Sequence, residues 1–314
     1  MRDPTIILAG ATGNLGERIA RALCERGAKV RALVRRATSG EKIGRLQKLG
    51  VSLTEVDFAK RSDLREACAG GACVVLALAG LRDVIVETQT ALLEAAVEAG
   101  VPRFIPSDYC IDFTKLAPGS NRNLDFRREF HARLDKAPIA ATTIFNGAFA
   151  DLLTGQAPIV LFKLKRVLYW ENADQRMDFT TVDDTAAFTA LASLDSSTPR
   201  FLRVAGDQIS ARELAAAASA VTGKDFRLLR AGGLKRLEMF IKVARALSRG
   251  DGELYPPWQG MQYLHNMFSG RATLAPLDND RYQGIRWTSA REVLASRLTR
   301  SADPSATRLQ DVPR

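Results

Sequence analysis

The chain has 314 residues, of which 46% are hydrophobic and 25% are charged, with 12 prolines and 23 glycines. This composition is typical of a globular chain long enough for about two domains, and it excludes disordered and fibrous proteins. The formal charge of +10 is evenly spread, since residues 1–150 carry 22 basic and 17 acidic side chains and residues 151–314 carry 23 and 18. The even spread argues against a nucleic-acid partner but suits a site that binds phosphates.

Several other classes of protein are excluded by what the chain lacks. Its longest nearly uncharged apolar stretch, Ala72 to Leu81, is far shorter than the roughly 20 residues that span a bilayer. The first residues have no apolar signal-peptide core, so we expect a cytoplasmic protein without a membrane span. The four cysteines show no CxxC spacing and there are only two histidines, which favours buried thiols over a disulfide framework, a metal site or a Ser-His-Asp triad.

The first 106 residues alternate between apolar strands and helical patterns. A strand over Thr5 to Ala9 leads into a glycine loop, after which Leu15, Ile19 and Leu23 recur at helical spacing until Gly27. The same analysis predicts further strands over residues 29–34, 50–56, 73–78 and 103–106, and helices over 42–49, 62–69 and 84–99. Alternation of this kind predicts an α/β fold with a doubly wound parallel sheet of the Rossmann type.

Beyond residue 106 a helix over 123–136 and a strand over 140–145 complete the pattern, so we place a first domain at residues 1–150. The rhythm then loosens, and residues 151–300 are assigned to a smaller substrate lobe, although the segment 180–206 is expected to return to the first domain. The elements expected there are a bent strand over 159–170, a helix over 185–194, a strand over 200–205, helices over 211–221 and 234–247, an aromatic loop-rich segment over 255–268 and a helix over 290–298. Residues 301–314 are polar with two prolines and are expected to form a flexible tail.

The glycine loop is the strongest functional signal in the sequence. It follows a strand, opens a helix and has G-x-x-G-x-x-G spacing, an arrangement in which backbone amides and the helix dipole can bind a pyrophosphate. Gly10 permits the tight turn, Gly13 the close approach of the phosphates, and Gly16 the packing of the helix on the strand. We therefore predict a dinucleotide site that includes Gly10, Thr12, Gly13, Asn14, Leu15 and Gly16.

The end of the second strand indicates which dinucleotide binds. Proteins that prefer NAD usually carry an acidic residue there, whereas this chain has Arg35 and Arg36. A guanidinium can pair with a 2′-phosphate, so we predict NADP(H); the alternative is that both arginines are ordinary surface residues. Asp57, which follows the third strand, is placed at the adenine rim. Ala79, Ser107 and Asn146, near the ends of later strands, are also assigned to the cofactor site.

Together these residues resemble a known family. The loop GATGNLG, the segment EAAVEAGVPRFIPSDY from Glu94 to Tyr109 and the NGAF stretch from Asn146 to Phe149 are similar to the NmrA-like branch of the atypical short-chain dehydrogenases, which includes isoflavone and phenylcoumaran benzylic ether reductases. The resemblance covers about residues 5–195. It implies a Rossmann domain that binds NADP(H) and a smaller C-terminal lobe that forms a cleft for a small-molecule substrate.

The catalytic residues are harder to predict. None of the five tyrosines is followed four residues later by lysine, so the Tyr-x-x-x-Lys pair of ordinary short-chain dehydrogenases is absent. The resemblance implies a lysine on the helix after the fifth strand, but a gapless count places Arg127 there, which can hold an oxyanion but cannot donate a proton near neutral pH. We therefore assign Arg127 and Tyr109 as catalytic candidates, and treat His131, one turn beyond Arg127, as a packing or surface residue.

Two functions fit these observations. The first is an NADPH-dependent reductase of a small aromatic carbonyl, quinone or ether compound. The aromatic cluster of Tyr255, Trp258, Tyr263 and Phe268 is a candidate cap for its cleft, with ordinary packing of the lobe as the alternative. The second, which the resemblance also allows, is a non-catalytic NADP(H) sensor that acts through a protein partner. The basic, amphipathic segment from Leu234 to Arg249 is interpreted mainly as a core-facing helix with a solvated side, with contact to a membrane or nucleic acid as its alternative.

Overall fold

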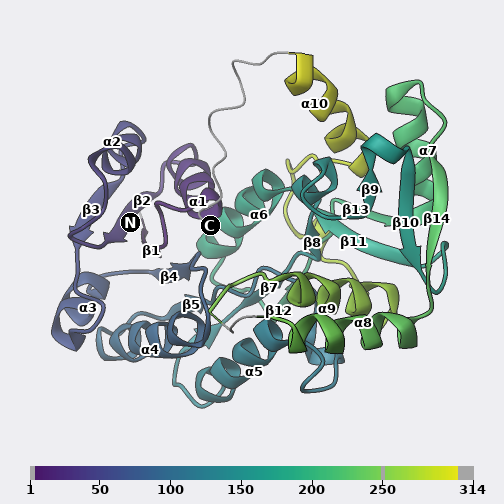
Figure 1. Cartoon of the computed structure of the whole chain (residues 1–314). Coiled ribbons are helices and arrows are strands. Elements are labelled where there is room, and N and C mark those ends of the chain that lie inside the picture. Colours follow the sequence, from purple (N-terminus) through teal and green to yellow (C-terminus); the bar gives the residue numbers. More distant parts are fainter. Residues whose placement is uncertain (1–3, 249–251, 303–314) are drawn as a thin grey trace.

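The computed structural model describes residues 4–248 and 252–302, and it contains the predicted parallel sheet (Figure 1). Six strands pair in the order β3-β2-β1-β4-β5-β6, and every pairing between them is parallel. This is the order of a dinucleotide-binding Rossmann sheet, in which ligands bind at the carboxyl ends of the strands beside the central crossover. The α/β fold class is confirmed, and within the described residues no helix combines the length and apolar character needed to cross a bilayer.

The sheet region contains most of the elements that were predicted along residues 5–145. Its strands are β1 (Thr5–Ala9), β2 (Lys29–Val34), β3 (Ser52–Glu55), β4 (Cys73–Leu76), β5 (Arg103–Ile105) and β6 (Ala140–Ala141). Its helices are α1 (Asn14–Cys24), α2 (Gly40–Lys48), α3 (Arg61–Cys68), α4 (Gln89–Glu98) and α5 (Arg122–Leu134). The predicted helix over 84–99 begins as a π-helical segment, η1 (Asp83–Thr88), and the predicted strand over 140–145 divides into β6 and β7 (Thr143–Phe145).

Alternating side chains of the strands supply a core on each face of the sheet. Ile6 and Leu8 point to the face covered by α1 and α6 (Val182–Leu194), and Ile7 and Ala9 point to the face covered by α3, α4 and α5 (Figure 1). The segment after α6 also lies in this region, because β12 (Phe201–Arg203) pairs in parallel with β7. The first core therefore includes Phe188 and Leu202, although these residues follow the second lobe's first strands in sequence.

The second lobe is built around two small sheets with the orders β14-β10-β9 and β13-β11-β8. Its strands are β8 (Ala148–Phe149), β9 (Val160–Leu161), β10 (Arg166–Trp170), β11 (Arg176–Thr180), β13 (Asp207–Ser210) and β14 (Arg227–Gly232). Its helices are α7 (Ala211–Thr222), α8 (Leu234–Ala246), α9 (Pro257–Phe268) and α10 (Ala290–Ala302). A third apolar core lies between these elements, so the lobe has an interior of its own.

Two expectations for this lobe are wrong. The segment over 255–268, expected to be rich in loops, forms helix α9, with proline at its first position and Trp258, Leu264 and Phe268 buried. The predicted core-facing helix over 234–247 ends at Ala246 as α8, and Leu247, its expected last residue, is 77% exposed. Arg249 and residues 303–314 lie outside the described residues.

Candidate functional site

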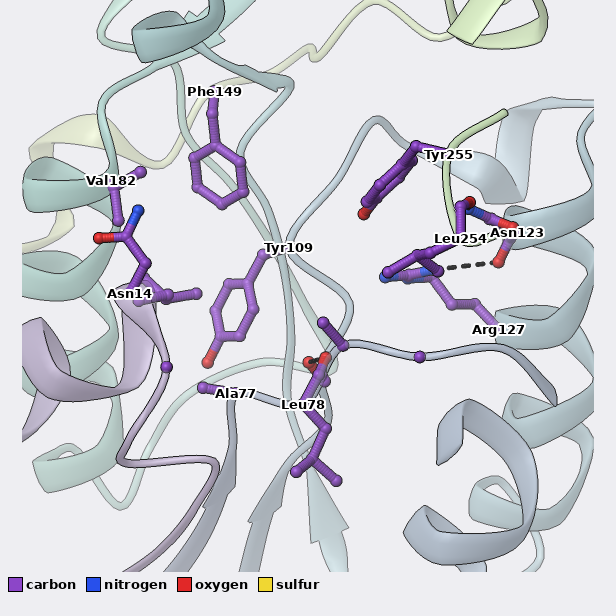
Figure 2. A pocket seen from close by; sticks show the side chains of 15 residues that line it. Asn14, Ala77, Leu78, Tyr109, Asn123, Arg127, Phe149, Val182, Leu254 and Tyr255 are labelled. Atoms are coloured by element: carbon purple, nitrogen blue, oxygen red, sulfur yellow. Dashed lines mark hydrogen bonds between the residues drawn. The ribbon is translucent and has the colours of Figure 1, made fainter. Parts of the chain in front are cut away.

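A cavity of about 240 Å³ lies where the glycine loop, the ends of β4 and β5, helix α5 and the second lobe meet (Figure 2). Its position at the carboxyl ends of parallel strands is where a Rossmann sheet binds its ligand. The residues that line it are Gly13, Asn14, Leu15, Ala77, Leu78, Ala79, Gly80, Ser107, Tyr109, Asn123, Arg127, Phe149, Val182, Leu254 and Tyr255.

The three loop glycines differ in what surrounds them. A side chain at Gly10 would overlap the carbonyl of Ala77, and the φ angle of +85° is one that favours glycine. A side chain at Gly16 would overlap the backbone of Gly10, so helix α1 packs directly on the loop. A Cβ at Gly13 would come no closer than 3.3 Å to its nearest neighbour, the Gly10 carbonyl oxygen, and Gly13 lines the cavity. Gly10 and Gly16 thus shape the loop, while Gly13 keeps the cavity open.

The same loop leaves the start of α1 free to bind an anion. The N-cap is Gly13, which has no side chain to accept hydrogen bonds from the first backbone N–H groups of the helix. Those groups and the positive end of the helix dipole therefore face the cavity beside Asn14 and Leu15. Phosphate groups are the usual ligands of such a helix start.

The arginines assigned to the 2′-phosphate lie outside this cavity. Arg35 and Arg36 are exposed directly after β2, and the guanidinium of Arg35 lies 5.7 Å from the centroid of the Phe58 ring. Neither arginine forms an ion pair within the described part of the chain. Asp57 is also exposed, and its carboxylate accepts a hydrogen bond of 3.0 Å from the backbone of Ala59. All three side chains lie just beyond the carboxyl ends of β2 and β3.

Ser107 lines the cavity and is held rigidly. Its backbone N–H donates to Gln89 Oε1 at 2.9 Å, and its hydroxyl donates to the carbonyl of Leu78 at 2.7 Å. Gln89 is fully buried directly after the π-helical segment and donates to the Ile85 carbonyl within it. Asn146, in contrast, is not among the lining residues: it is fully buried, and its amide lies 3.3 Å from the Thr185 hydroxyl.

Arg127 enters the cavity from α5 with one guanidinium nitrogen hydrogen-bonded and a second beside a buried carboxylate. Its side chain is 11% exposed, Nη1 donates to the Asn123 carbonyl at 3.0 Å, and Nε lies 3.9 Å from Asp108 Oδ1. The Asp108 carboxylate is fully buried, so the guanidinium supplies the countercharge that it needs. Within the described residues neither Nε nor Nη2 has a hydrogen-bond partner, and since Nε is buried on the side of Asp108, Nη2 is the atom that Arg127 offers to a ligand.

Behind Arg127 lies a buried polar network that the sequence analysis missed. Asp108 accepts from His131 Nε2 at 2.5 Å and from the Thr143 hydroxyl at 3.0 Å. Arg200 Nη2 lies 3.2 Å from His131 Nδ1, so the imidazole lies between a guanidinium on one side and the Asp108 carboxylate on the other. Burial opposes the charge on Asp108, but His131, Arg127 and Thr143 hold the pKa of its carboxyl below the usual value. His131 is thus part of this network rather than a surface residue.

The two tyrosines of the cavity lie on opposite walls (Figure 2). Tyr109 stands on the sheet side with its hydroxyl directed toward Ala77, and burial raises the pKa of that hydroxyl. Tyr255 comes from the second lobe and lies above Arg127 with its hydroxyl directed into the cavity. The segment that carries Tyr255 is tied to the start of α5, because the Leu254 carbonyl accepts from Arg122 at 3.0 Å and from Asn123 at 3.1 Å.

The cavity therefore brings together part of the predicted site. Of the assigned residues it is lined by Gly13, Asn14, Leu15, Ala79, Ser107, Tyr109 and Arg127. Gly10, Thr12 and Gly16 belong to the loop behind it, Arg35, Arg36 and Asp57 lie at the strand ends beyond it, and Asn146 is buried. Sequence analysis gave no role to Leu78, Asn123, Val182 and Leu254; of these only Asn123, one turn before Arg127, had a signal in the helical spacing.

Comparison with known proteins shows one family. The sequence model of the NmrA-like family matches residues 2–244. Pinoresinol reductase 1 of Arabidopsis thaliana is 29% identical over 208 residues, which are 62% of this chain and 65% of that protein, so the match spans slightly less than two thirds of the relative. The bifunctional pinoresinol-lariciresinol reductase of Linum perenne is 26% identical over 274 residues, which are 81% of this chain and 87% of the relative.

Solved structures share the fold over nearly the whole chain. The AtPrR2 structure with NADP+ and (+)pinoresinol superposes with a TM-score of 0.80 at 22% identity, over 94% of this chain and 99% of that one. The binary complex of leucoanthocyanidin reductase and NADPH from Vitis vinifera gives a TM-score of 0.77 at 15% identity, with the same coverage. At these identities the likeness establishes the architecture of both lobes.

Proposed function

Because the chain belongs to the NmrA-like family, we propose that it is an NADPH-dependent reductase of a small aromatic carbonyl, quinone or ether compound. One observation carries the proposal: a single cavity joins the uncapped start of α1 to the guanidinium of Arg127. The first is a site for a pyrophosphate, and the second can stabilise negative charge on a substrate oxygen. The relatives and structures named above are reductases, two of them in complex with NADP+ or NADPH.

The residues present fit NADP(H). The N–H groups at the start of α1 and the open position at Gly13 suit the pyrophosphate, and Asn14 and Leu15 border it. Arg35 and Arg36 suit the 2′-phosphate, because they are exposed cations without a carboxylate partner within the described residues. When bound, this cofactor supplies a hydride to the substrate.

The residues of the cavity have separate roles in the proposed reaction. Arg127 Nη2 donates to the substrate oxygen and stabilises the charge that develops on it, while Asp108 keeps the guanidinium in place. Ser107, whose hydroxyl is committed to Leu78, forms a fixed wall beside the site. Apolar side chains favour an aromatic substrate and exclude water from it; they are Leu78, Tyr109, Phe149, Val182 and Leu254.

We also propose separate roles for the two parts of the chain. Residues 1–150, together with the returning segment 180–206, bind the cofactor, and residues 151–300 form the substrate lobe. The contribution of Leu254 and Tyr255 to the cavity supports this division, since both come from the second lobe. The alternative of a non-catalytic sensor has no support from the relatives named above, because they are reductases.

The test is cofactor oxidation by the purified chain. We expect NADPH, and to a smaller extent NADH, to be oxidised when benzaldehyde, p-quinones or benzylic ethers are supplied one at a time. Calorimetric titration with NADPH in the absence of substrate separates binding from turnover. Tight NADPH binding with no turnover on the whole panel would contradict the reductase and leave the sensor as the better hypothesis.

A further inference from the structure

The proposed reductase needs a proton donor that the sequence did not identify. A carbonyl that accepts a hydride at carbon leaves negative charge on its oxygen, and that oxygen must take up a proton. Three side chains that line the cavity are titratable, namely Tyr109, Arg127 and Tyr255. Arginine cannot supply the proton, because its pKa lies far above neutral pH.

The two tyrosines are distinguished by where their hydroxyl groups point. The Tyr109 hydroxyl is directed toward Ala77 at the glycine-loop side, away from Arg127 (Figure 2). The Tyr255 hydroxyl is directed into the cavity on the same side as the Arg127 guanidinium. A substrate oxygen held by Arg127 therefore lies beside Tyr255 and across the cavity from Tyr109.

The position of Tyr255 is fixed by contacts that do not involve its own ring. Arg122 donates to the carbonyl groups of Glu253 and Leu254 at 2.8 and 3.0 Å, and Asn123 donates to Leu254 at 3.1 Å. These donors occupy the first turn of α5, one turn before Arg127. The phenol of Tyr255, from the second lobe, thus lies beside the guanidinium of Arg127, from the first lobe.

From this juxtaposition we propose that Tyr255 is the catalytic proton donor and that Tyr255 and Arg127 together replace the missing Tyr-x-x-x-Lys pair. The inference rests on the proposed reductase function. The substrate carbonyl carbon gains the hydride, the π electrons of the C=O bond move to oxygen, and that oxygen takes the phenolic proton. NADPH is oxidised and the carbonyl is reduced to an alcohol. The guanidinium stabilises the resulting phenolate, which regains a proton from water because Tyr255 is 62% exposed.

The chain offers matched variants for the test. Tyr255→Phe removes only the hydroxyl and keeps the ring, while Tyr109→Phe makes the same change on the opposite wall. Tyr169→Phe makes it on β10, at a residue that does not line the cavity. We expect Tyr255→Phe to lower kcat for benzaldehyde on the order of a hundredfold with KM changed less than threefold. Tyr169→Phe is expected to retain at least a third of the wild-type kcat, and a larger loss of kcat in Tyr109→Phe than in Tyr255→Phe would overturn the assignment.

A binding measurement supplies a readout besides turnover. Benzaldehyde added to the protein with NADP+ cannot be reduced, yet its carbonyl oxygen can still accept the Tyr255 hydrogen bond. We expect Tyr255→Phe to weaken this binding about tenfold by calorimetry, the size of a hydrogen bond to a well-placed oxygen. Wild-type turnover that Tyr255→Phe retains at more than a third of its value would overturn the assignment while leaving the reductase intact. No turnover by the wild type would instead refute the reductase and the donor together.

Discussion

The two walls of the cavity are encoded in different ways. The glycine-loop wall consists of consecutive residues, Gly10 to Gly16, whose spacing alone prescribes a turn and a helix start. The opposite wall is assembled from separate segments that contribute Arg127 and Tyr255, and the network of Asp108 and Arg200 lies behind Arg127. A short-range motif can be read from the sequence because its geometry is local, whereas a polar network among distant residues exists only once the fold has brought them together.

The largest effect is expected at Gly13, on the glycine-loop wall. Gly13→Val should abolish measurable NADPH binding, a loss of more than about a hundredfold, because the side chain would enter the space of the pyrophosphate. The fold should survive, since a Cβ there meets nothing closer than 3.3 Å. Calorimetry measures the affinity and thermal unfolding measures the stability.

Gly16→Val is the matched control for this experiment. Its side chain would collide with the Gly10 backbone, so the variant should lose roughly 3 kcal/mol of stability through overpacking rather than binding affinity alone. If Gly13→Val bound NADPH as the wild type does, the assignment of the glycine loop to the cofactor would be wrong.

The contrast between the two walls also explains how far the sequence could predict the fold. Strands β1 and β2 were predicted residue for residue, because each is an apolar run bounded by glycine or a charged pair. Strands β11, β13 and β14 were missed: their segments contain Arg176, Asp207 and Arg227, and their pairing with β10 and with one another is long-range. The helical period of α9 was obscured by its clustered aromatic residues.

The candidate site shows the same difference between local motifs and long-range contacts. The family resemblance and a gapless count identified Arg127. Nothing local indicated that Asp108 would accept a hydrogen bond from His131, because the partners are 23 residues apart and meet only after β5 and α5 pack together. The exposed cap residue Tyr255 was part of a predicted aromatic cap, but its direction depends on the Arg122 contacts between the lobes. Side-chain direction across a domain interface has no sequence signature.

A second prediction concerns Arg127, on the wall opposite the glycine loop. Arg127→Ala should lower turnover on the order of a hundredfold, the usual scale for one transition-state donor, and leave NADPH affinity nearly unchanged. The variant should also lose roughly 1 to 3 kcal/mol of stability, because the buried Asp108 carboxylate loses one of the partners that stabilise its charge and keeps His131 and Thr143. Steady-state kinetics and denaturant unfolding measure the two effects separately.

The double variant Arg127→Ala/Asp108→Asn distinguishes these two roles. Neutralising the carboxylate should recover most of the stability, whereas turnover should stay low because the donor is still missing. Full turnover in Arg127→Ala would remove Arg127 from the catalytic machinery, and unchanged stability would show that Asp108 does not depend on it.

A smaller effect is expected at Arg35, which lies outside the cavity after β2. Arg35→Ala should reduce the preference for NADPH over NADH by about 10- to 100-fold, since a charge-assisted contact to the 2′-phosphate contributes roughly 1.5 to 3 kcal/mol. Titrating both cofactors into the variant measures the ratio. Lys48→Ala, an exposed cation at the end of α2, is the control and should leave the ratio alone. An unchanged ratio in Arg35→Ala would make that arginine an ordinary surface residue.

The smallest effect is expected in the second lobe, where the start of α7 tests whether a short sequence motif stabilises the structure by itself. Ser210 and Glu213 form a capping box at the start of α7, with Glu213 accepting from the Ser210 backbone at 2.8 Å and pairing with Arg176 at 2.7 Å. The Arg176 hydrogen bond, followed by the Ser210 N–H, lowers the Glu213 pKa to about 2.

Because this pKa is depressed on folding, the ionised carboxylate stabilises the protein above the unfolded value of about 4.3, and the contribution disappears as the pH falls toward 2. Glu213→Gln should therefore cost less than about 1 kcal/mol at pH 7, since the pair is largely exposed and screened, and nothing at pH 2. Urea unfolding at both pH values measures the difference against Glu25→Gln, an exposed control on the first lobe. A cost that persisted at pH 2 would show that packing of the side chain, and not its charge, stabilises the start of α7.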